Sequence, residues 1–471
     1  MNRKPRPSTR RPVACAALLT LLAALACLIA GPPQANAAVP APGDEFWRKA
    51  YDGPGHAGDL ANDLVLAPGG TAVYVTGSLM PEGAVKSDLA VIKYKVGGSR
   101  AWLRTYDGVA HGNDEGNAVV CDRAGNVYVG GFTDTATHGR DFLLIKYDAA
   151  GHRKWVRTVN GGANGNDVIK ALALDAKGNV YAAGSSVEIG INITSDATLV
   201  KWTPTGKRAW VRTYDGSANR QDEFRDLVID KVRGRIYAAG VLGIDLTNPG
   251  WLLIRYSTAG TRAWAQTYSV ADTANDCTSV ALAPGGTVVQ AGNAGQTAVH
   301  RFDALVTKWT PAGAVAWSEG YAGPDSDGFT DVAVDRQGTI FAVGSTMSAL
   351  VNDDALVCRF TPDGTLDNFI TIGGGTYSDR FTAVTCDAAG HVYAAGYVGT
   401  TLYNQDWVTA KLSNDLATVF WQPRAREHNV ACDDVPAAIA VRTGTNPGVY
   451  VTGRGSQTAS TWDWLTIKYK P

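Results

Sequence analysis

Two histidines occupy the same place in neighbouring repeats of this 471-residue chain, His56 and His111. Imidazole nitrogens bind metals and anions, so two of them one repeat apart could share such a ligand. The equivalent positions in the next two repeats hold Asn164 and Asn219, which favours polar turn residues over a metal site. His56, His111 and the acids near them are also the candidates for a catalytic site.

A second group of residues matches part of a calcium-binding loop. Asp325-Ser326-Asp327-Gly328 is followed by Asp331, and calcium takes several hard oxygen ligands. The segment lacks a third acid within the loop and a distal Glu. Asp325, Asp327 and Asp331 are therefore an incomplete calcium candidate, and no metal site is predicted.

Aromatic residues gather near the C-terminus. Tyr397, Tyr403 and Trp407 lie in one repeat, and Trp462 and Trp464 lie in the next. Exposed rings in adjacent loops could stack on sugars or on another apolar ligand. The alternative is that Trp407 and Trp464 begin their strands and pack inward.

The composition favours an all-β protein with many turns. The chain has 53 Gly, 9% aromatic residues and only 18% charged residues. Its net charge of −1 argues against a nucleic-acid partner bound through bulk charge. No Gly-x-Ser-x-Gly, His-Glu-x-x-His or phosphate-binding loop occurs, and we expect no cofactor.

The strongest feature is a repeat of about 53 residues. An aromatic residue marks each of eight copies: Trp47, Trp102, Trp155, Trp210, Trp264, Trp317, Phe369 and Trp421. A glycine ending an apolar run keeps the same period, as does an apolar-x-cation-aromatic sequence such as Ile145-Lys146-Tyr147. A period of this length is typical of the blades of a β-propeller.

Each repeat reads as four short antiparallel strands joined by tight turns. The chain opens at Trp47 to Tyr51 with a fourth strand that has no first three before it. It ends with three strands, at about 435–442, 448–453 and 463–469, that have no fourth. We predict eight four-stranded blades over 45–471, with the N-terminal strand completing the last blade, which removes exposed sheet edges.

Aspartates precede two strands of nearly every repeat. Those before the first strand are Asp59, Asp114, Asp167, Asp222, Asp276, Asp327, Asp379 and Asp433. Those before the third strand are Asp88, Asp141, Asp196, Asp303, Asp354, Asp406 and Asp463. Because strands alternate in direction, both sets lie on one face of the ring, which we call the top face. We expect them to bond backbone N–H groups and fix turns, with the third-strand cations as their partners from blade to blade.

Residues 114–158 resemble the bacterial β-propeller repeat family called SBBP. The shared pattern is Asp-x-x-x-x-Ala-x-x-x-Asp-x-x-Gly-Asn-Val-Tyr-x-x-Gly, then Asp-Phe-x-x-x-Lys-Tyr-Asp-x-x-Gly, then the Trp strand. Leu366-Asp367-Asn368-Phe369 resembles the related Delta-60 repeat. The family name implies seven blades, which is the alternative to the eight copies counted here. The resemblance implies an exported or surface protein and no particular reaction.

The turn-then-Trp pattern from Asp148 to Trp155 resembles the tryptophan-docking repeat of quinoprotein dehydrogenases. The chain lacks the adjacent cysteine pair of those enzymes, so no quinone is expected.

The first 37 residues read as a secretory signal peptide. Five cations precede an apolar stretch, Val13 to Ala30, and Ala35-Asn36-Ala37 forms a small-x-small cleavage site. Arg10-Arg11 leaves twin-arginine export open beside the general secretory route. Cleavage leaves a short segment, 38–44, before the propeller, and no membrane span.

The mature chain would have 38 basic and 44 acidic residues, a net charge of −6. Five cysteines would remain: Cys121, Cys277, Cys358, Cys386 and Cys432. They do not form a disulfide framework, and at least one stays unpaired within a monomer. We expect Cys121 and Cys386 to be small buried hydrophobes.

The leading hypothesis is a non-enzymatic, exported, monomeric propeller of the bacterial envelope or exterior. It would bind a glycan or a protein on its top face. The alternative is a secreted polysaccharide-active enzyme, a lyase or hydrolase, and a pure scaffold is a third class. Fold alone does not decide between them.

Overall fold

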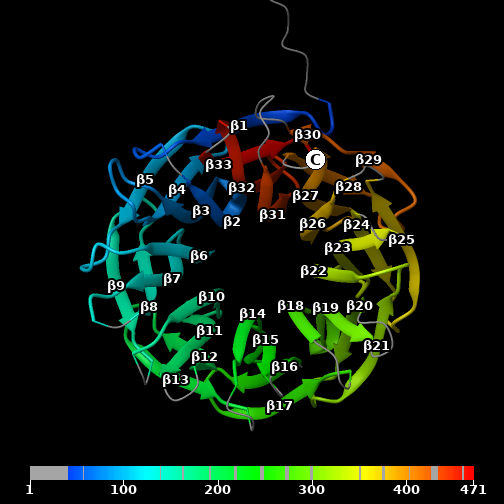
Figure 1. Cartoon of the computed structure of the whole chain (residues 1–471), viewed down its shortest axis with the longest axis horizontal. Coiled ribbons are helices and arrows are strands. Elements are labelled where there is room, and N and C mark those ends of the chain that lie inside the picture. The colour runs from blue at the N-terminus through cyan, green and yellow to red at the C-terminus, as the bar shows by residue number, and fades with distance from the viewer. Residues whose placement is uncertain are drawn as a thin grey trace, which may run out of the picture. The chain divides into compact units, whose positions relative to one another are not determined.

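The computed structural model describes residues 41–471, apart from 57, 138, 162–163, 190–192, 217–219, 244–248, 271–274, 297–300, 349–351, 374–376, 402–403, 426–432 and 459–460. The prediction of eight blades is confirmed, since eight antiparallel sheets follow one another around a ring (Figure 1). In each blade the first strand is innermost and the fourth is outermost.

The first four blades follow the repeat closely. Blade 1 comprises β2 (Leu60–Leu66), β3 (Ala72–Leu79), β4 (Asp88–Lys95) and β5 (Arg100–Tyr106). Blade 2 comprises β6 (Asp114–Cys121), β7 (Val127–Asp134), β8 (Arg140–Tyr147) and β9 (Arg153–Val159). Blade 3 comprises β10 (Asp167–Leu174), β11 (Val180–Ile189), β12 (Ile193–Trp202) and β13 (Arg208–Tyr214). Blade 4 comprises β14 (Glu223–Asp230), β15 (Arg235–Gly243), β16 (Pro249–Ser257) and β17 (Arg262–Tyr268).

Blades 5 and 6 keep the same order. Blade 5 comprises β18 (Asn275–Leu282), β19 (Val288–Gln296), β20 (Arg301–Trp309) and β21 (Val315–Tyr321). Blade 6 comprises β22 (Asp327–Val334), β23 (Ile340–Ser348), β24 (Asn352–Phe360) and β25 (Leu366–Ile372). The 3-10 turns η1 (Pro68–Gly70) and η2 (Pro284–Gly286) join the first two strands of blades 1 and 5.

The last two blades are irregular. Blade 7 comprises β26 (Arg380–Cys386), β27 (Val392–Thr401), β28 (Asn404–Leu412), β29 (Val419–Trp421) and β30 (Arg424–Ala425). Its outer strand is divided into β29 and β30 around Pro423, which cannot donate a ladder hydrogen bond. Blade 8 comprises β31 (Val435–Arg442), β32 (Gly448–Thr458), β33 (Thr461–Tyr469) and β1 (Glu45–Tyr51).

The ring closes as predicted. Strand β1 pairs with β33, with Trp47 opposite Lys468 and Tyr51 opposite Trp464. Beyond the strands, Gly43 N donates to Lys470 O at 2.9 Å, and Lys470 N donates to Asp44 O at 2.9 Å. The two ends of the propeller chain therefore replace the turn that joins the third and fourth strands in every other blade.

A β-bulge recurs in the innermost strand of every blade. In blade 1 the pairing of β2 with β3 shifts around Asn62, and in blade 2 that of β6 with β7 shifts around Asn117. The bulge explains why a glycine recurs opposite it in the second strand of each repeat. A Cβ on Gly77, for example, would lie 1.8 Å from Leu60 O. The bulged residue bonds the next blade, as Asn117 Nδ2 does by donating to Ile169 O at 2.9 Å.

The repeated tryptophan packs between blades, as predicted. Trp102 in the outer strand of blade 1 lies against Gly151 in the third-to-fourth-strand turn of blade 2, and its Nε1 donates to Ala149 O at 3.3 Å. Gly151 has φ +86°, a conformation that favours glycine, and a Cβ there would lie 2.9 Å from the indole. Trp155 and Gly206 repeat this contact one blade further on.

The core is divided into clusters, several of which join two adjacent blades. One contains Tyr74 and Val91 of blade 1 with Val129 and Tyr147 of blade 2. Another joins Tyr393 of blade 7 to residues of blade 8. The stability of each blade therefore depends on its neighbours.

The cysteines within the described residues are all free: Cys121, Cys277, Cys358 and Cys386. Cys121 and Cys386 are half-buried and pack against core clusters. Burial raises the pKa of both thiols to about 12. They therefore stay protonated at neutral pH. Cys432 lies outside the described residues.

We predict that Gly151→Ala destabilises the protein more than Gly285→Ala. Both residues have positive φ, but a Cβ at Gly285 would meet nothing within 4 Å. Each substitution costs about 1–2 kcal/mol for the left-handed backbone, and displacement of Trp102 adds about 1–3 kcal/mol at Gly151. Urea unfolding measures the two free energies. An equal loss in both variants would show that the tryptophan contact does not stabilise the ring.

Candidate functional site

The top-face aspartates fix turns, as expected. Asp222 Oδ2 accepts a hydrogen bond from Gly216 N at 2.5 Å, and Oδ1 accepts one from Gly243 N at 2.8 Å. One donor lies in the loop that enters the blade, and the other is the last residue of its second strand, β15. Asp59 bonds Gly53 N and Met80 N in the same way.

The carboxylate before the first strand fixes turns in this way in blades 1 to 4, 6 and 7. Blade 5 differs from our expectation, because Asn275 takes this place and accepts from Val270 N at 3.2 Å. Asp276 instead bonds Arg225 of blade 4.

The third-strand cations do not pair with these aspartates, contrary to our expectation. Lys93 Nζ donates to Ala149 O at 2.7 Å, and Lys201 Nζ donates to Thr258 O at 2.6 Å. Their partners do belong to the next blade, but they are backbone carbonyls in turns on the opposite face, which we call the bottom face. The physical reason is strand length: Lys93 lies near the end of β4, whereas Asp88 begins it.

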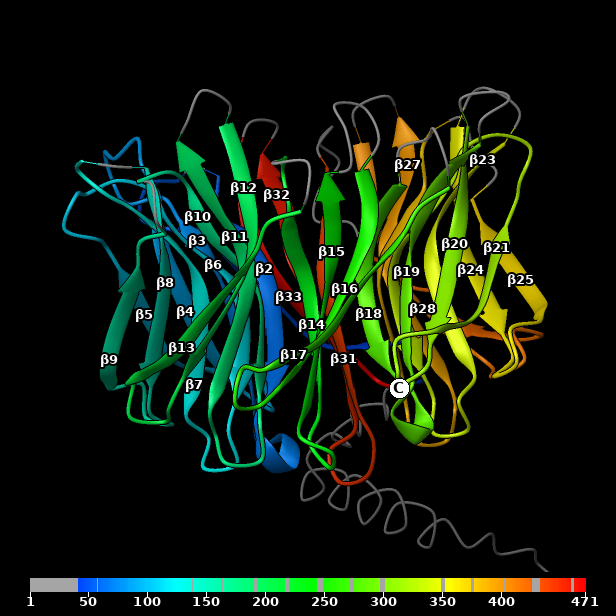
Figure 2. The same ribbon diagram turned by 90° about the horizontal axis from the view of Figure 1, so that it is seen from below.

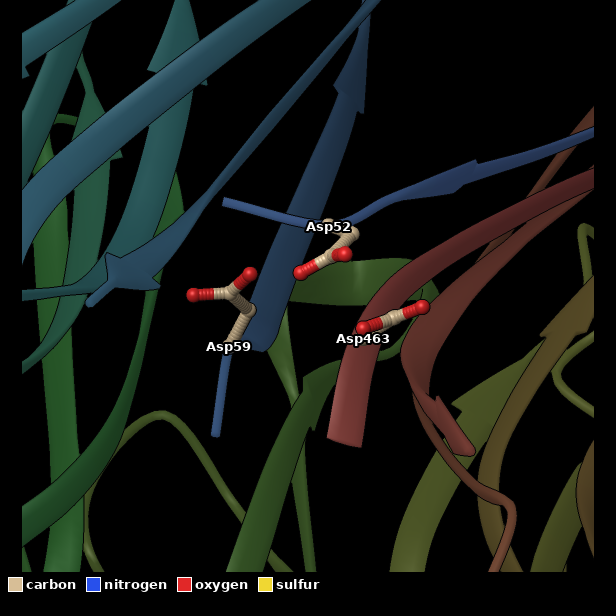
Figure 3. A group of neighbouring side chains, drawn as sticks. All are labelled: Asp52, Asp59 and Asp463. Carbon is tan, nitrogen blue, oxygen red and sulfur yellow. The ribbon is translucent and has the colours of Figure 1, made fainter. Parts of the chain in front are cut away.

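Two blade junctions gather three carboxylates each. One group is Asp52, Asp59 and Asp463, between blades 8 and 1 (Figure 3). The other is Asp88, Asp107 and Asp114, between blades 1 and 2. In both groups the ligand oxygens lie within 4.8 Å of one another.

Burial is the main cause of altered acidity at these junctions. It raises the pKa of Asp59, and it raises those of Asp88 and Asp114 to about 6 with help from neighbouring negative charges. Calcium needs six to eight oxygen ligands. Both oxygens of Asp59 already accept backbone hydrogen bonds. These carboxylates are therefore better placed to accept hydrogen bonds from a polar ligand than to enclose a metal ion.

The two histidines each bond an acid of their own loop. His56 Nδ1 lies 2.5 Å from Asp52 Oδ2, and His111 Nδ1 lies 2.6 Å from Asp107 Oδ2. The hydrogen bond and charge of the aspartate raise the pKa of each imidazole. Both histidines have positive φ and are exposed, and Asn164 has the same backbone conformation. The polar-turn interpretation therefore accounts for all three positions.

The residues of the calcium candidate are not gathered into a site. Asp327 Oδ2 accepts from Gly323 N at 2.5 Å, as the equivalent aspartates of other blades do. Asp331 is half-buried in the inner strand, where it accepts from Val384 N and Ser279 Oγ, both at 2.8 Å, in the two neighbouring blades. Neither carboxylate group found among the described residues includes Asp325, Asp327 or Asp331.

The aromatic residues divide into core and surface. Trp407 and Trp464 are fully buried, so neither ring is available at the surface, and Tyr397 is half-buried. Tyr403 lies outside the described residues. Trp462 is 40% exposed, with the Arg454 guanidinium 4.8 Å from its ring centroid. Among the described residues of the expected aromatic surface, Trp462 is therefore the one with an exposed ring.

A cavity of about 300 Å³ at the junction of blades 8 and 1 was not expected from the sequence. It opens between the outer strands of blades 8 and 1, and its lining residues are Tyr51, Pro54, Leu79, Pro81, Asp88, Leu103 and Thr105. Pro81 departs from the repeat in the loop after the second strand, and this departure was the available signal. A volume of this size suits a small ligand or one residue of a polymer.

The comparisons with known proteins identify a fold and no family. No family model matches the chain, and no curated protein matches it. The solved structure of Sqt1 from Chaetomium thermophilum is similar with a TM-score of 0.58 and 12% identity, covering 91% of this chain and 99% of that one. The β-propeller domain of the Trilobed protease from Pyrococcus furiosus gives a TM-score of 0.44 and 7% identity, covering 78% and 97%.

A periplasmic gluconolactonase of Pseudomonas aeruginosa gives a TM-score of 0.43 and 11% identity, covering 68% of this chain and 87% of that one. At such identities, similarity extends to the fold alone. In addition, the described residues form no helix of the length and hydrophobicity that crossing a membrane requires.

We predict that thermal stability rises as the pH falls from 7 to about 4.5. Burial raises the pKa of several aspartates from 3.8 to about 6: Asp88, Asp114, Asp167, Asp222, Asp327 and Asp331. In this window the folded chain binds protons that the unfolded chain releases, so stability is lost as the pH rises. The raised pKa values of His56 and His111 act in the same direction.

Carboxyls with lowered pKa, such as Asp175, titrate below this window. Circular dichroism melting curves at pH 4.5, 5.5 and 7 measure the trend. Asp167→Asn should flatten the slope, because it removes one of the titrating groups. A midpoint that falls steadily on acidification from pH 7 would contradict the assignment.

Proposed function

We propose that this chain is an exported, non-enzymatic propeller that binds a glycan on its top face, where blade 8 meets blade 1. The observation that carries the proposal is Trp462, the tryptophan exposed among the described residues. Indole rings stack on the apolar faces of sugars and contribute a large contact area. A surface indole that the core does not bury is available for such a contact.

The surroundings of Trp462 suit a polar sugar. Its carbonyl accepts a hydrogen bond from Asp59 N at 2.8 Å, which holds the residue against the junction. Asp463 follows it in sequence and belongs to the carboxylate group of Figure 3. Carboxylates accept hydrogen bonds from sugar hydroxyls, and the exposed His56 can donate one.

The charge of the junction narrows the glycan class. Three carboxylates lie together there, so a polyanionic glycan would be repelled. Neutral glycans, or those that carry amino groups, fit better. The cavity lined by Tyr51 and Leu103 lies at the junction of the same two blades and adds apolar surface there.

Export is part of the proposal and rests on residues 1–37, which lie outside the described residues. Their cations, apolar stretch and small-x-small site have the order of a secretory signal peptide. Membership of the SBBP repeat family, proposed on residues 114–158, agrees with an exported protein.

A polysaccharide-active enzyme is the second candidate, and Asp88 favours it. Its carboxyl lines the 300 Å³ cavity, and burial raises its pKa to about 6. A carboxyl with a pKa near 6 keeps its proton in mildly acidic solution, where it can act as a general acid. Shortening of a bound glycan during incubation would favour this candidate, and an intact glycan would favour the binding protein.

We predict that Trp462→Ala weakens glycan binding by about tenfold or more, the effect of losing a stacking contact. Residues 38–471 and the variant are compared on a glycan array. Because the side chain is partly exposed, the melting temperature should change little. The matched control is Phe420→Ala, which removes an exposed ring that also lies over a cation, Lys411, in blade 7.

Loss of glycan binding in both variants, or full binding by Trp462→Ala, would overturn the proposal that Trp462 stacks on the glycan. Absence of binding by the unaltered chain would overturn the glycan class over the range that the array covers. Trp407→Ala and Trp464→Ala do not test the proposal, because both rings are buried and their removal would cost about 3–5 kcal/mol of stability.

A further inference from the structure

A groove crosses the bottom face over blades 2, 3 and 4, at the turns that join their first and second strands. It consists of two adjoining cavities of about 290 and 160 Å³, which share Asp175, Ala176, Lys177 and Lys231. The bottom face carries the opposite strand ends from the top face (Figure 2). The groove is therefore separate from the proposed glycan site.

The groove is lined by cations from successive blades. Arg123 belongs to blade 2, Lys177 to blade 3 and Lys231 to blade 4, and all three are exposed. Lys201 lies deeper, where its Nζ donates to Thr258 O at 2.6 Å. Positive charge is thus distributed along the groove instead of being concentrated at one point.

The acids of the same turns are engaged locally. Asp122 accepts hydrogen bonds from the backbone of Ala124 and Asn126 and from the Asn126 side chain, at 2.7–2.9 Å. Asp175 does the same with Lys177 N and both nitrogens of Asn179. These carboxylates therefore stabilise their own turns, and the cations are left to face solvent.

The cluster is a departure from the repeat. The equivalent turns of blades 1, 5 and 7 contain no cation, and those of blades 6 and 8 carry isolated ones, Arg336 and Arg442. Blades 2, 3 and 4 thus carry cations in three successive turns. In blade 4 the turn is one residue longer, and Arg233 bonds Asp230 at 3.0 Å, which leaves Lys231 to the groove. A residue type that the fold required would occur in every blade, so this cluster is not needed for folding.

We propose that the groove binds a polyanion, whose successive carboxylate, sulfate or phosphate groups contact Arg123, Lys177 and Lys231 in turn. The net charge is −1 for the whole chain and −6 without residues 1–37, so any attraction comes from the groove and not from the net charge. Local attraction of this kind is strong at low salt and weakens as salt screens the charges. The inference does not depend on the glycan site, which has the opposite charge.

The test measures binding of residues 38–471 to three fluorescent probes: oligogalacturonate, a heparin octasaccharide and polyphosphate. These probes distinguish carboxylate, sulfate and phosphate as the recognised group. Fluorescence anisotropy at 50 and 200 mM NaCl gives the affinity and its salt dependence. We expect at least one probe to bind, and to bind more weakly at the higher salt concentration.

Lys177→Ala/Lys231→Ala should weaken that binding by about tenfold or more. The control, Arg336→Ala/Lys49→Ala, also removes two positive charges, one of them from the same turn of blade 6. It should change the affinity less than about twofold. An equal loss in both variants, or no binding of any probe at 50 mM NaCl, would overturn the proposal. Circular dichroism melting curves check that both variants fold.

Discussion

The contact between each outer-strand tryptophan and the next blade is the interaction on which the ring depends. The indole lies on a glycine of left-handed conformation in the neighbouring turn, as Trp155 does on Gly206. Its Nε1 and the third-strand lysine then bond the same carbonyl, Pro204 O. Each blade that carries the tryptophan therefore presents an aromatic residue to the turn of the next blade. Blade 6 is the exception, because its Phe369 is 47% exposed and packs on Tyr321 of blade 5.

This requirement explains how the chain closes. The tryptophan of blade 7, Trp421, needs a turn in blade 8, where the chain has its two ends. Gly43 takes the place of the turn glycine, and a Cβ there would lie 2.9 Å from Trp421. Bonds between Gly43, Asp44 and Lys470 join the N-terminal and C-terminal segments at this point. Closure thus repeats the same contact with two chain ends instead of a continuous turn.

Architecture could be predicted because the signals that carry it are local and recur eight times. The number of blades and the closure of the ring could be predicted from strand alternation, turn glycines and the incomplete first and last repeats. The partners of Lys93 could not be assigned correctly, because a shared period does not say which end of a strand a side chain reaches. The bulge opposite Gly77 was also missed, since it depends on a pairing shift between two strands.

The burial of two of the predicted binding tryptophans could have been inferred by comparing equivalent positions of the repeats. Trp407 and Trp464 occupy the third-strand position of Phe142 and Trp251, and all four side chains are buried. Trp462 is two residues before Trp464 and so lies on the same side of β33, but it stands at the start of that strand, where its ring is 40% exposed. The 300 Å³ cavity depends on how loops of two blades pack, which no single repeat contains.

Residues that recur in every blade serve the ring, and those that break the repeat mark the two proposed sites. The most direct measurement of the central claim is hydrogen–deuterium exchange of residues 38–471, with and without an oligosaccharide retained on the array. The account predicts slower exchange in peptides that contain 52–56 and 461–466, at the junction of blades 8 and 1. Slower exchange confined to other blades would contradict it.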